Sequence, residues 1–150
     1  RAVYEVDGMS VRTALDAIVT VVSGVSGIRQ APTNPTDNPS IYPFAVCYVM
    51  DGQLVNGAMG TRKHLVNIAI ELLTARKDLA RDMALISPYI DSICAALIAE
   101  VSDSGGRFGG TISAFEGVNY ELLPDVNYAG VQMIGYRFTM TNVKILENTI

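Results

Sequence analysis

The sequence has one histidine and only two cysteines among its 150 residues, so few side chains are available for metal binding or nucleophilic catalysis. A zinc site of the usual composition needs several histidine or cysteine ligands at close spacing. His64 has no second histidine, and Cys47 and Cys94 lie far apart in the chain. We therefore expect no metal, no cofactor and no Ser-His-Asp or Cys-His catalytic centre. Both cysteines are predicted to be buried free thiols, which indicates a reducing cytoplasm.

Charge is also scarce and its balance is acidic. Charged residues make up 17% of the chain and the net charge is −4. Proteins that wrap nucleic acid carry a basic stripe, whereas the lysines and arginines here are scattered, so no specific nucleic-acid binding is expected. No uncharged apolar run reaches the roughly 18 residues that a membrane helix requires, so we expect no membrane association.

Two patterns in the sequence invite a functional interpretation but have simpler structural explanations. The string GGRFGG (residues 105–110) lacks the Gly-Lys-Ser/Thr ending of a phosphate-binding loop and precedes a strand, so it is predicted to be a flexible connector. Asp78 and Asp82 are one helical turn apart, a spacing at which carboxylates can share a proton. At the start of a helix they more simply favour the positive end of its dipole, and we expect both to be solvated.

Apolar residues at steps of three and four predict two helices. The first begins at Ser10, a suitable N-cap, and ends at Gly24 and Gly27. The second spans residues 79–101 and is expected to kink or break at Pro88, because an interior proline costs about 3 kcal/mol.

Alternating apolar residues predict four strands, preceded by a proline-rich exposed loop over residues 30–43. The apolar face of the fourth strand should pack under the helices. The alternating residues are, strand by strand, Phe44, Val46, Tyr48 and Met50; Val66, Ile68, Ile70 and Leu72; Ile112, Ala114, Val118 and Tyr120; Ile134, Tyr136, Phe138 and Met140.

The first two strands are expected to form a hairpin whose connection, residues 51–62, is much longer than a turn requires. Long glycine-containing loops often work outside the fold, so this loop is a candidate for such a role.

The element order is therefore α-β-β-α-β-β, which indicates an α+β fold: a four-stranded, mostly antiparallel sheet with two helices packed on one face. Residues 9–150 are expected to form a single domain, and residues 1–8 a tag or an upstream remnant. Hydrophobic residues make up 49% of the sequence, more than one small core needs, so self-association is expected.

Several strings in this layout resemble the tail-terminator and tail-completion proteins of long-tailed bacteriophages. The resemblance covers nearly all of residues 9–145 and depends on layout and local character, without a catalytic signature. The strings are SVRTALDAIVTVV, NPSIYPFAVCYV, HLVNIAIELL, KDLARDM and NYAGVQMIGYRFTMTNVKI.

The resemblance implies a non-enzymatic virion protein that is made in the bacterial cytoplasm. It implies a ring, hexameric in this family, at the head-proximal end of the tail. Loops of such ring proteins often order only on assembly, so the resemblance implies assembly interfaces at residues 51–62 and 102–110. The interface residues implied in these two segments are Asp51, Gly52, Gln53, Leu54, Asn56, Gly57, Met59, Arg62, Gly105, Gly106, Arg107 and Phe108. Such a ring would end tail-tube polymerisation and offer a surface for head–tail joining, so the expected partners are other copies of the chain, the tail-tube protein and a neck or head-completion protein. The alternatives are a neck, head-completion or tail-tube-like subunit, or a small-molecule-binding α+β domain.

Overall fold

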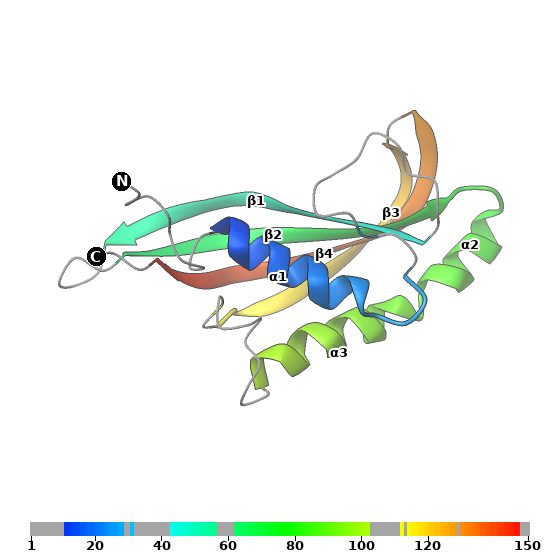
Figure 1. The fold of residues 1–150 in the computed structure, drawn as a ribbon. Helices are drawn as coiled ribbons and strands as arrows, with labels where there is room; N and C mark the ends of the chain where they lie inside the picture. The colour runs from blue at the N-terminus through cyan, green and yellow to red at the C-terminus, as the bar shows by residue number, and fades with distance from the viewer. Residues whose placement is uncertain are drawn as a thin grey trace.

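The computed structural model describes residues 11–28, 31, 43–56, 62–102, 112, 114–128 and 130–147. Its sheet has four strands in the order β1-β2-β4-β3, and every neighbouring pair is antiparallel, which confirms the predicted α+β class (Figure 1). The elements are α1 (Val11–Ser23), β1 (Phe44–Asn56), β2 (Arg62–Ala75), α2 (Leu79–Ile86), α3 (Tyr89–Ser102), β3 (Gly117–Tyr128) and β4 (Val131–Glu147).

The helices begin and end largely where sequence patterns predict. The apolar positions of α1 are buried, and Gly27 follows the helix with a φ of +98°, a conformation that glycine adopts readily. The predicted N-cap, Ser10, lies outside the described residues. The predicted break at Pro88 is confirmed, because α2 ends at Ile86 and α3 begins at Tyr89.

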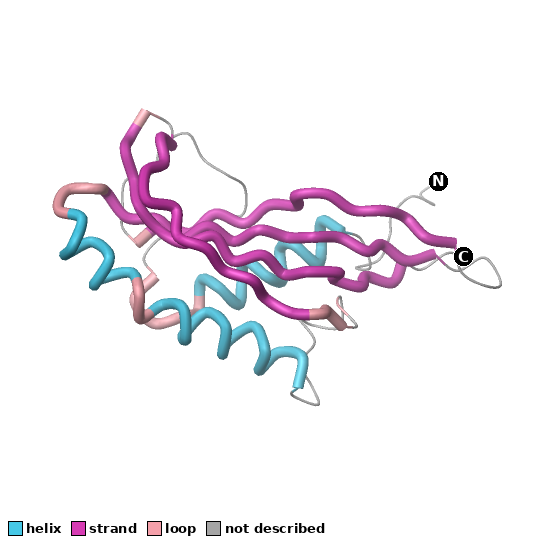
Figure 2. Tube along the Cα trace, turned by 180° about the vertical axis from the view of Figure 1, so that it is seen from behind, coloured by secondary structure: helices cyan, strands magenta, loops and turns pink. Residues whose placement is uncertain are grey.

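One core joins the helices to the sheet. Cys47, Ile70 and Phe138 are register neighbours across β1, β2 and β4, and they pack in one cluster with Ile18 of α1 and Leu97 of α3. Figures 1 and 2 show α1 lying over one face of the sheet, with α3 beside it. The predicted inward face of β4 is confirmed at this cluster.

The opposite face of the sheet is apolar only at one end. The first four residues of β1 are all buried, so Phe44 and Val46 are covered as fully as their core-facing neighbours Ala45 and Cys47. Because successive side chains in a strand point to opposite faces, the alternation read from Phe44 to Met50 marks the face away from the core cluster. That face becomes polar farther along β1, at Tyr48.

The prediction of a long loop over residues 51–62 was wrong. Residues 51–56 continue β1 and Arg62 begins β2, with Asp51 opposite Asn67 and Asn56 opposite Arg62. The pair Asp51-Gly52 is typical of a turn, but the structure gives another reason for a glycine at position 52. A Cβ on Gly52 would lie 2.5 Å from Val66 Cγ1, so the approach of β2 excludes a side chain there.

Other predictions at the strand ends need correction or lie outside the described part of the chain. β3 begins at Gly117, later than predicted: Ala114 forms only an isolated bridge to Lys144, and Ile112 is buried outside any strand. The predicted interface residues Gly57, Met59, Gly105, Gly106, Arg107 and Phe108 are not among the described residues.

The sheet changes phase at Asn67. Met50 of β1 has no register partner on β2, and β4 has two residues, Thr141 and Asn142, between the partners of Val66 and Ile68. Asn142 has a φ of 50°, a left-handed conformation that asparagine tolerates better than most residues. Bulges on both sides of β2 therefore flank the same residue.

Replacing Phe138 with alanine should lower the free energy of unfolding by about 3 to 5 kcal/mol, because its ring is fully buried at the centre of the core. Denaturant melting measures the change. Leu54→Ala is the control, since Leu54 is about half exposed and should change stability by less than about 1 kcal/mol. A loss below about 1 kcal/mol for Phe138→Ala would contradict this assignment of the core face.

Candidate assembly interface

The exposed half of β1 lies at the far end of the β1–β2 hairpin, where β2 is still paired with β4. We call residues 51–56 and 62–67 the arm; its tip lies at the end of the sheet opposite α2 (Figure 1). Residues 50–54 of β1 are all exposed, although their side chains alternate between the two faces. Leu54 is 49% exposed and Met50, at the base of the arm, is 45% exposed. β1 is also an edge strand, so one side of its backbone faces no neighbouring strand of this sheet.

Asn67 fixes the base of the arm with its amide group. Its Nδ2 donates a hydrogen bond to Asp51 Oδ1 over 2.6 Å, and its Oδ1 accepts one from the Asn142 backbone N–H over 3.1 Å. One side chain on β2 thereby links the bulged strands on both sides. The arm consequently has a defined starting geometry even though little of it is buried.

Four of the predicted interface residues, Asp51, Gly52, Gln53 and Leu54, together with Asn56, are confirmed as exposed but lie on a strand instead of a loop. Arg62 opens β2 opposite Asn56. The interface role of this segment stays a prediction, and the loop from which it was argued was wrong for residues 51–56 and 62. The bulge at Met50, which keeps the strand going through Asp51-Gly52, has no simple sequence signal.

A polar cluster crosses all four strands on the face away from the core cluster. Glu71 of β2 accepts hydrogen bonds from Tyr48 Oη of β1 and from Arg137 Nε of β4, the latter over 3.1 Å. Arg137 Nη1 also donates to Glu121 Oε1 of β3 over 3.1 Å. Glu71 is only 8% exposed, so its charge depends on these partners. Burial and the neighbouring Glu71 raise the pKa of Tyr48 above its ordinary value.

We call this cluster of Tyr48, Glu71, Glu121 and Arg137 the clasp, because it links the four strands. Each strand contributes one side chain, and each contact joins register neighbours or near neighbours. It was not predicted from the sequence, because Tyr48, Glu71, Glu121 and Arg137 become neighbours only when the strand order is known.

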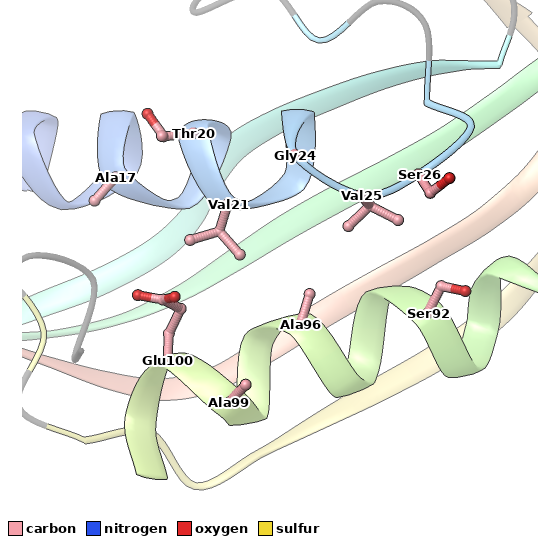
Figure 3. Close-up of a pocket in the computed structure, with 10 residues that line it drawn as sticks. All are labelled: Ala17, Thr20, Val21, Gly24, Val25, Ser26, Ser92, Ala96, Ala99 and Glu100. Carbon is pink, nitrogen blue, oxygen red and sulfur yellow. The ribbon is translucent and has the colours of Figure 1, made fainter. Parts of the chain in front are cut away.

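The surface between α1 and α3 is hollowed into a groove of about 790 Å³ (Figure 3). Small side chains dominate its walls, and Val21 and Val25 add apolar surface from the α1 side. Glu100 is the only ionisable residue among the ten that line it, and Figure 3 shows its carboxylate rising toward α1. The lining residues are Ala17, Thr20, Val21, Gly24, Val25, Ser26, Ser92, Ala96, Ala99 and Glu100.

The residues considered for chemistry are placed apart. Cys47 is a buried free thiol whose pKa burial raises to about 12, and Cys94 is a partly buried free thiol. His64 lies on the arm between Leu54 and Ile145 in the strand register. Within the described residues, no group of three or more histidine, cysteine or acidic side chains is arranged to hold a metal ion.

The expectation that Asp82 is solvated was wrong. Asp82 is only 5% exposed, and its Oδ2 accepts hydrogen bonds from the backbone N–H groups of Lys77 and Asp78 over 2.7 and 3.0 Å. Asp78 caps α2 by accepting from the Arg81 N–H. Both carboxylates therefore stabilise the start of the helix, as expected, but Asp82 does so by direct bonds to otherwise unpaired donors.

The helical segment Leu79–Glu100 is long and apolar enough, by length and composition alone, to pass as a membrane span, and 22% of its most apolar stretch of 18 residues is buried. Its continuity is interrupted between α2 and α3, and Asp82 is bonded at its start. We read the segment as a helical pair with an unusually apolar outer surface, at which Leu85 and Ile98 are exposed.

Comparisons with known proteins do not assign this chain to a family. A scan against models of known protein families finds no match, and a search of curated proteins finds no significantly similar sequence.

Replacing Asn67 with alanine should loosen the arm, because two hydrogen bonds that tie its base are lost. We expect amide hydrogen exchange over residues 51–56 to quicken about tenfold or more, with a loss of about 1 to 2 kcal/mol in global stability. The control is Asn119→Ala, an exposed asparagine on β3. Unchanged exchange in the arm would contradict this role of Asn67.

Replacing Arg137 with alanine should destabilise the fold by about 3 to 5 kcal/mol, because it leaves Glu71 buried without its cation. Glu121→Gln removes the more exposed partner of the same arginine and should cost at most about 1 kcal/mol. Thermal melting of both variants gives the comparison. Equal losses would mean that the burial of Glu71 is not what makes the cluster important.

Proposed function

We propose that this chain is a structural subunit of a tailed bacteriophage. It assembles as a ring at the head-proximal end of the tail, where it ends tail-tube polymerisation and provides the surface for head–tail joining. The observation that carries the proposal is the exposed arm. In the arm, β2 stays paired with β4 and Val66 belongs to the core, whereas the β1 side has apolar side chains in solvent and an open backbone edge.

Physical considerations favour a partner for this arm. Exposed edge strands tend to pair with another strand or to be covered, and β1 is an edge strand of this sheet. Contact with a neighbouring subunit would bury Leu54 and Met50 and cover this edge. The arm therefore supports assembly as the role of the chain better than it supports a role in chemistry.

The choice of a tail terminator among assembling proteins comes from the sequence resemblance. A hexamer of chains with net charge −4 would carry about −24, six times the charge of one chain. A ring of that charge would repel the phosphate backbone of DNA passing through it, which suits a channel that must not hold its cargo. The partners would be other copies of the chain, the tail-tube protein and a neck protein, in a virion assembled in the bacterial cytoplasm.

The small-molecule alternative has less support. Binding pockets for small ligands usually bring several polar groups together to fix orientation. In the α1–α3 groove the Thr20 and Ser92 hydroxyls donate to backbone carbonyls four residues earlier in the chain, at Asp16 and Pro88. Among the ten described lining residues, Glu100 is the only ionisable side chain that could orient a ligand.

Shortening the arm should abolish rings without unfolding the subunit. In the test variant, residues 55–63 are replaced by Asn-Gly, which closes a tight hairpin between Leu54 and His64. We expect a folded monomer by light scattering and no rings in electron micrographs, whereas the full chain forms closed rings. In a phage lacking this protein, the full chain should restore infectious particles with tails of uniform length and the variant should not.

Three outcomes would contradict the proposal. The shortened chain could still form rings and restore the phage, or the full chain could form open tubes, as a tail-tube subunit would. The full chain could also be found in the head of native particles and be absent from the tail end, which would favour the head-completion alternative.

A further inference from the structure

We propose that the groove between α1 and α3 receives the arm of a second copy of this chain, with Leu54 seated in the groove and the basic start of β2 beside Glu100. This inference rests on the proposed function and deepens it, because it names the two surfaces through which neighbouring subunits join.

The groove suits an apolar side chain from outside. Its volume of about 790 Å³ is bounded mainly by alanine, glycine and valine, so incoming aliphatic groups would meet carbon atoms at its walls (Figure 3). The Thr20 and Ser92 hydroxyls already donate to backbone carbonyls four residues earlier in the chain, over 3.0 and 3.4 Å. Filling the groove with an aliphatic side chain would therefore break none of these hydrogen bonds.

The arm offers an apolar side chain and basic residues that complement the groove. Leu54 is 49% exposed on a strand pair whose starting geometry Asn67 fixes. His64 is opposite Leu54 in the register, and the two basic residues that begin β2, Arg62 and Lys63, are opposite the next two residues of β1. Among the ten described residues that line the groove, Glu100 is the only ionisable one, and it is acidic. Apolar fit and opposite charge thus point to the same pairing.

The occupant must come from another copy. Within one chain the arm is held in its own sheet by register pairs out to Asn56 and Arg62, and its tip lies at the end of the sheet opposite α2 (Figure 1). A contact between two different surfaces of identical chains is heterologous, so it repeats around a closed ring or along an open filament. An arm-to-groove contact is therefore the kind of joint that a ring requires.

Disulfide trapping between copies tests the contact. In a Cys94→Ser background, one chain carries Leu54→Cys and a second chain carries Ala99→Cys, an exposed position in the groove. Cys47 should stay silent, because it is buried and its pKa is raised to about 12. After mild oxidation we expect covalent dimers in the mixture at least about tenfold above either chain alone.

Gln53→Cys mixed with the Ala99→Cys chain is the matched control. Gln53 neighbours Leu54 but its side chain points to the opposite face of the arm, so it should trap several-fold less efficiently. Absence of trapping in the Leu54 mixture, or equal trapping by Gln53, would overturn the inference. So would dominant dimers of the Leu54→Cys chain with itself, which would indicate a symmetric arm-to-arm contact.

Charge reversal gives an independent readout. Glu100→Lys should weaken self-association about tenfold in sedimentation experiments, and adding Lys63→Glu should restore most of the loss. Rings that form without trapping and without charge rescue would overturn the inference and leave the proposed function standing. Trapping and rescue within open filaments would do the reverse, keeping the arm-to-groove contact and removing the role in ending polymerisation.

Discussion

Inward-facing residues alternate without interruption along the whole of β2, whereas on β1 and β4 this alternation shifts at a bulge. The shape of the sheet depends on this difference. Val66, Ile68, Ile70 and Leu72 all face the core cluster. On β1 the inward residues are odd-numbered up to Val49, and on β4 they are even-numbered up to Met140. Beyond the bulges the inward residues of β4 become Val143 and Ile145. Asn67 ties both changes together, because its amide bonds one bulged strand on each side.

The paired bulges lie where the burial of β1 changes. Bulges bend a strand and increase its twist, and here two of them lie on either side of Asn67. Before that level, β1 is buried on both faces near Phe44; after it, β1 is exposed on both. The clasp at Glu71 lies on the buried side of the change and joins all four strands where they must stay in register.

Much of this fold follows from patterns that are local in the chain. The helix break at Pro88 follows from the missing N–H and the fixed φ of proline, and the burial of Phe138 follows from simple alternation. The class of sheet follows from the order of these elements. The prediction of a loop at residues 51–62 was wrong because Asp51-Gly52 has the composition of a turn, although the chain continues here as a strand.

Several features that the sequence did not predict are set by neighbours remote in the chain. A side chain at position 52 is disfavoured because Val66 approaches Gly52 across the hairpin. Gly135 is another case, since a Cβ there would lie 1.7 Å from the Leu72 carbonyl oxygen on β2. None of these approaches can be read until the pairing of strands is known.

A flexible loop and a paired strand differ in the conformational entropy that each loses on binding. A loop is a natural candidate for an interface because it is free to change shape, but a flexible loop loses conformational entropy when it binds. An arm that is already paired as two strands and tied at Asn67 has given up much of that freedom during folding. Contact with a neighbour then needs to order fewer residues, and the burial of a residue such as Leu54 can contribute more of its free energy to association. Exposed strands that are held in place are therefore better suited than free loops to join subunits repeatedly and in one geometry.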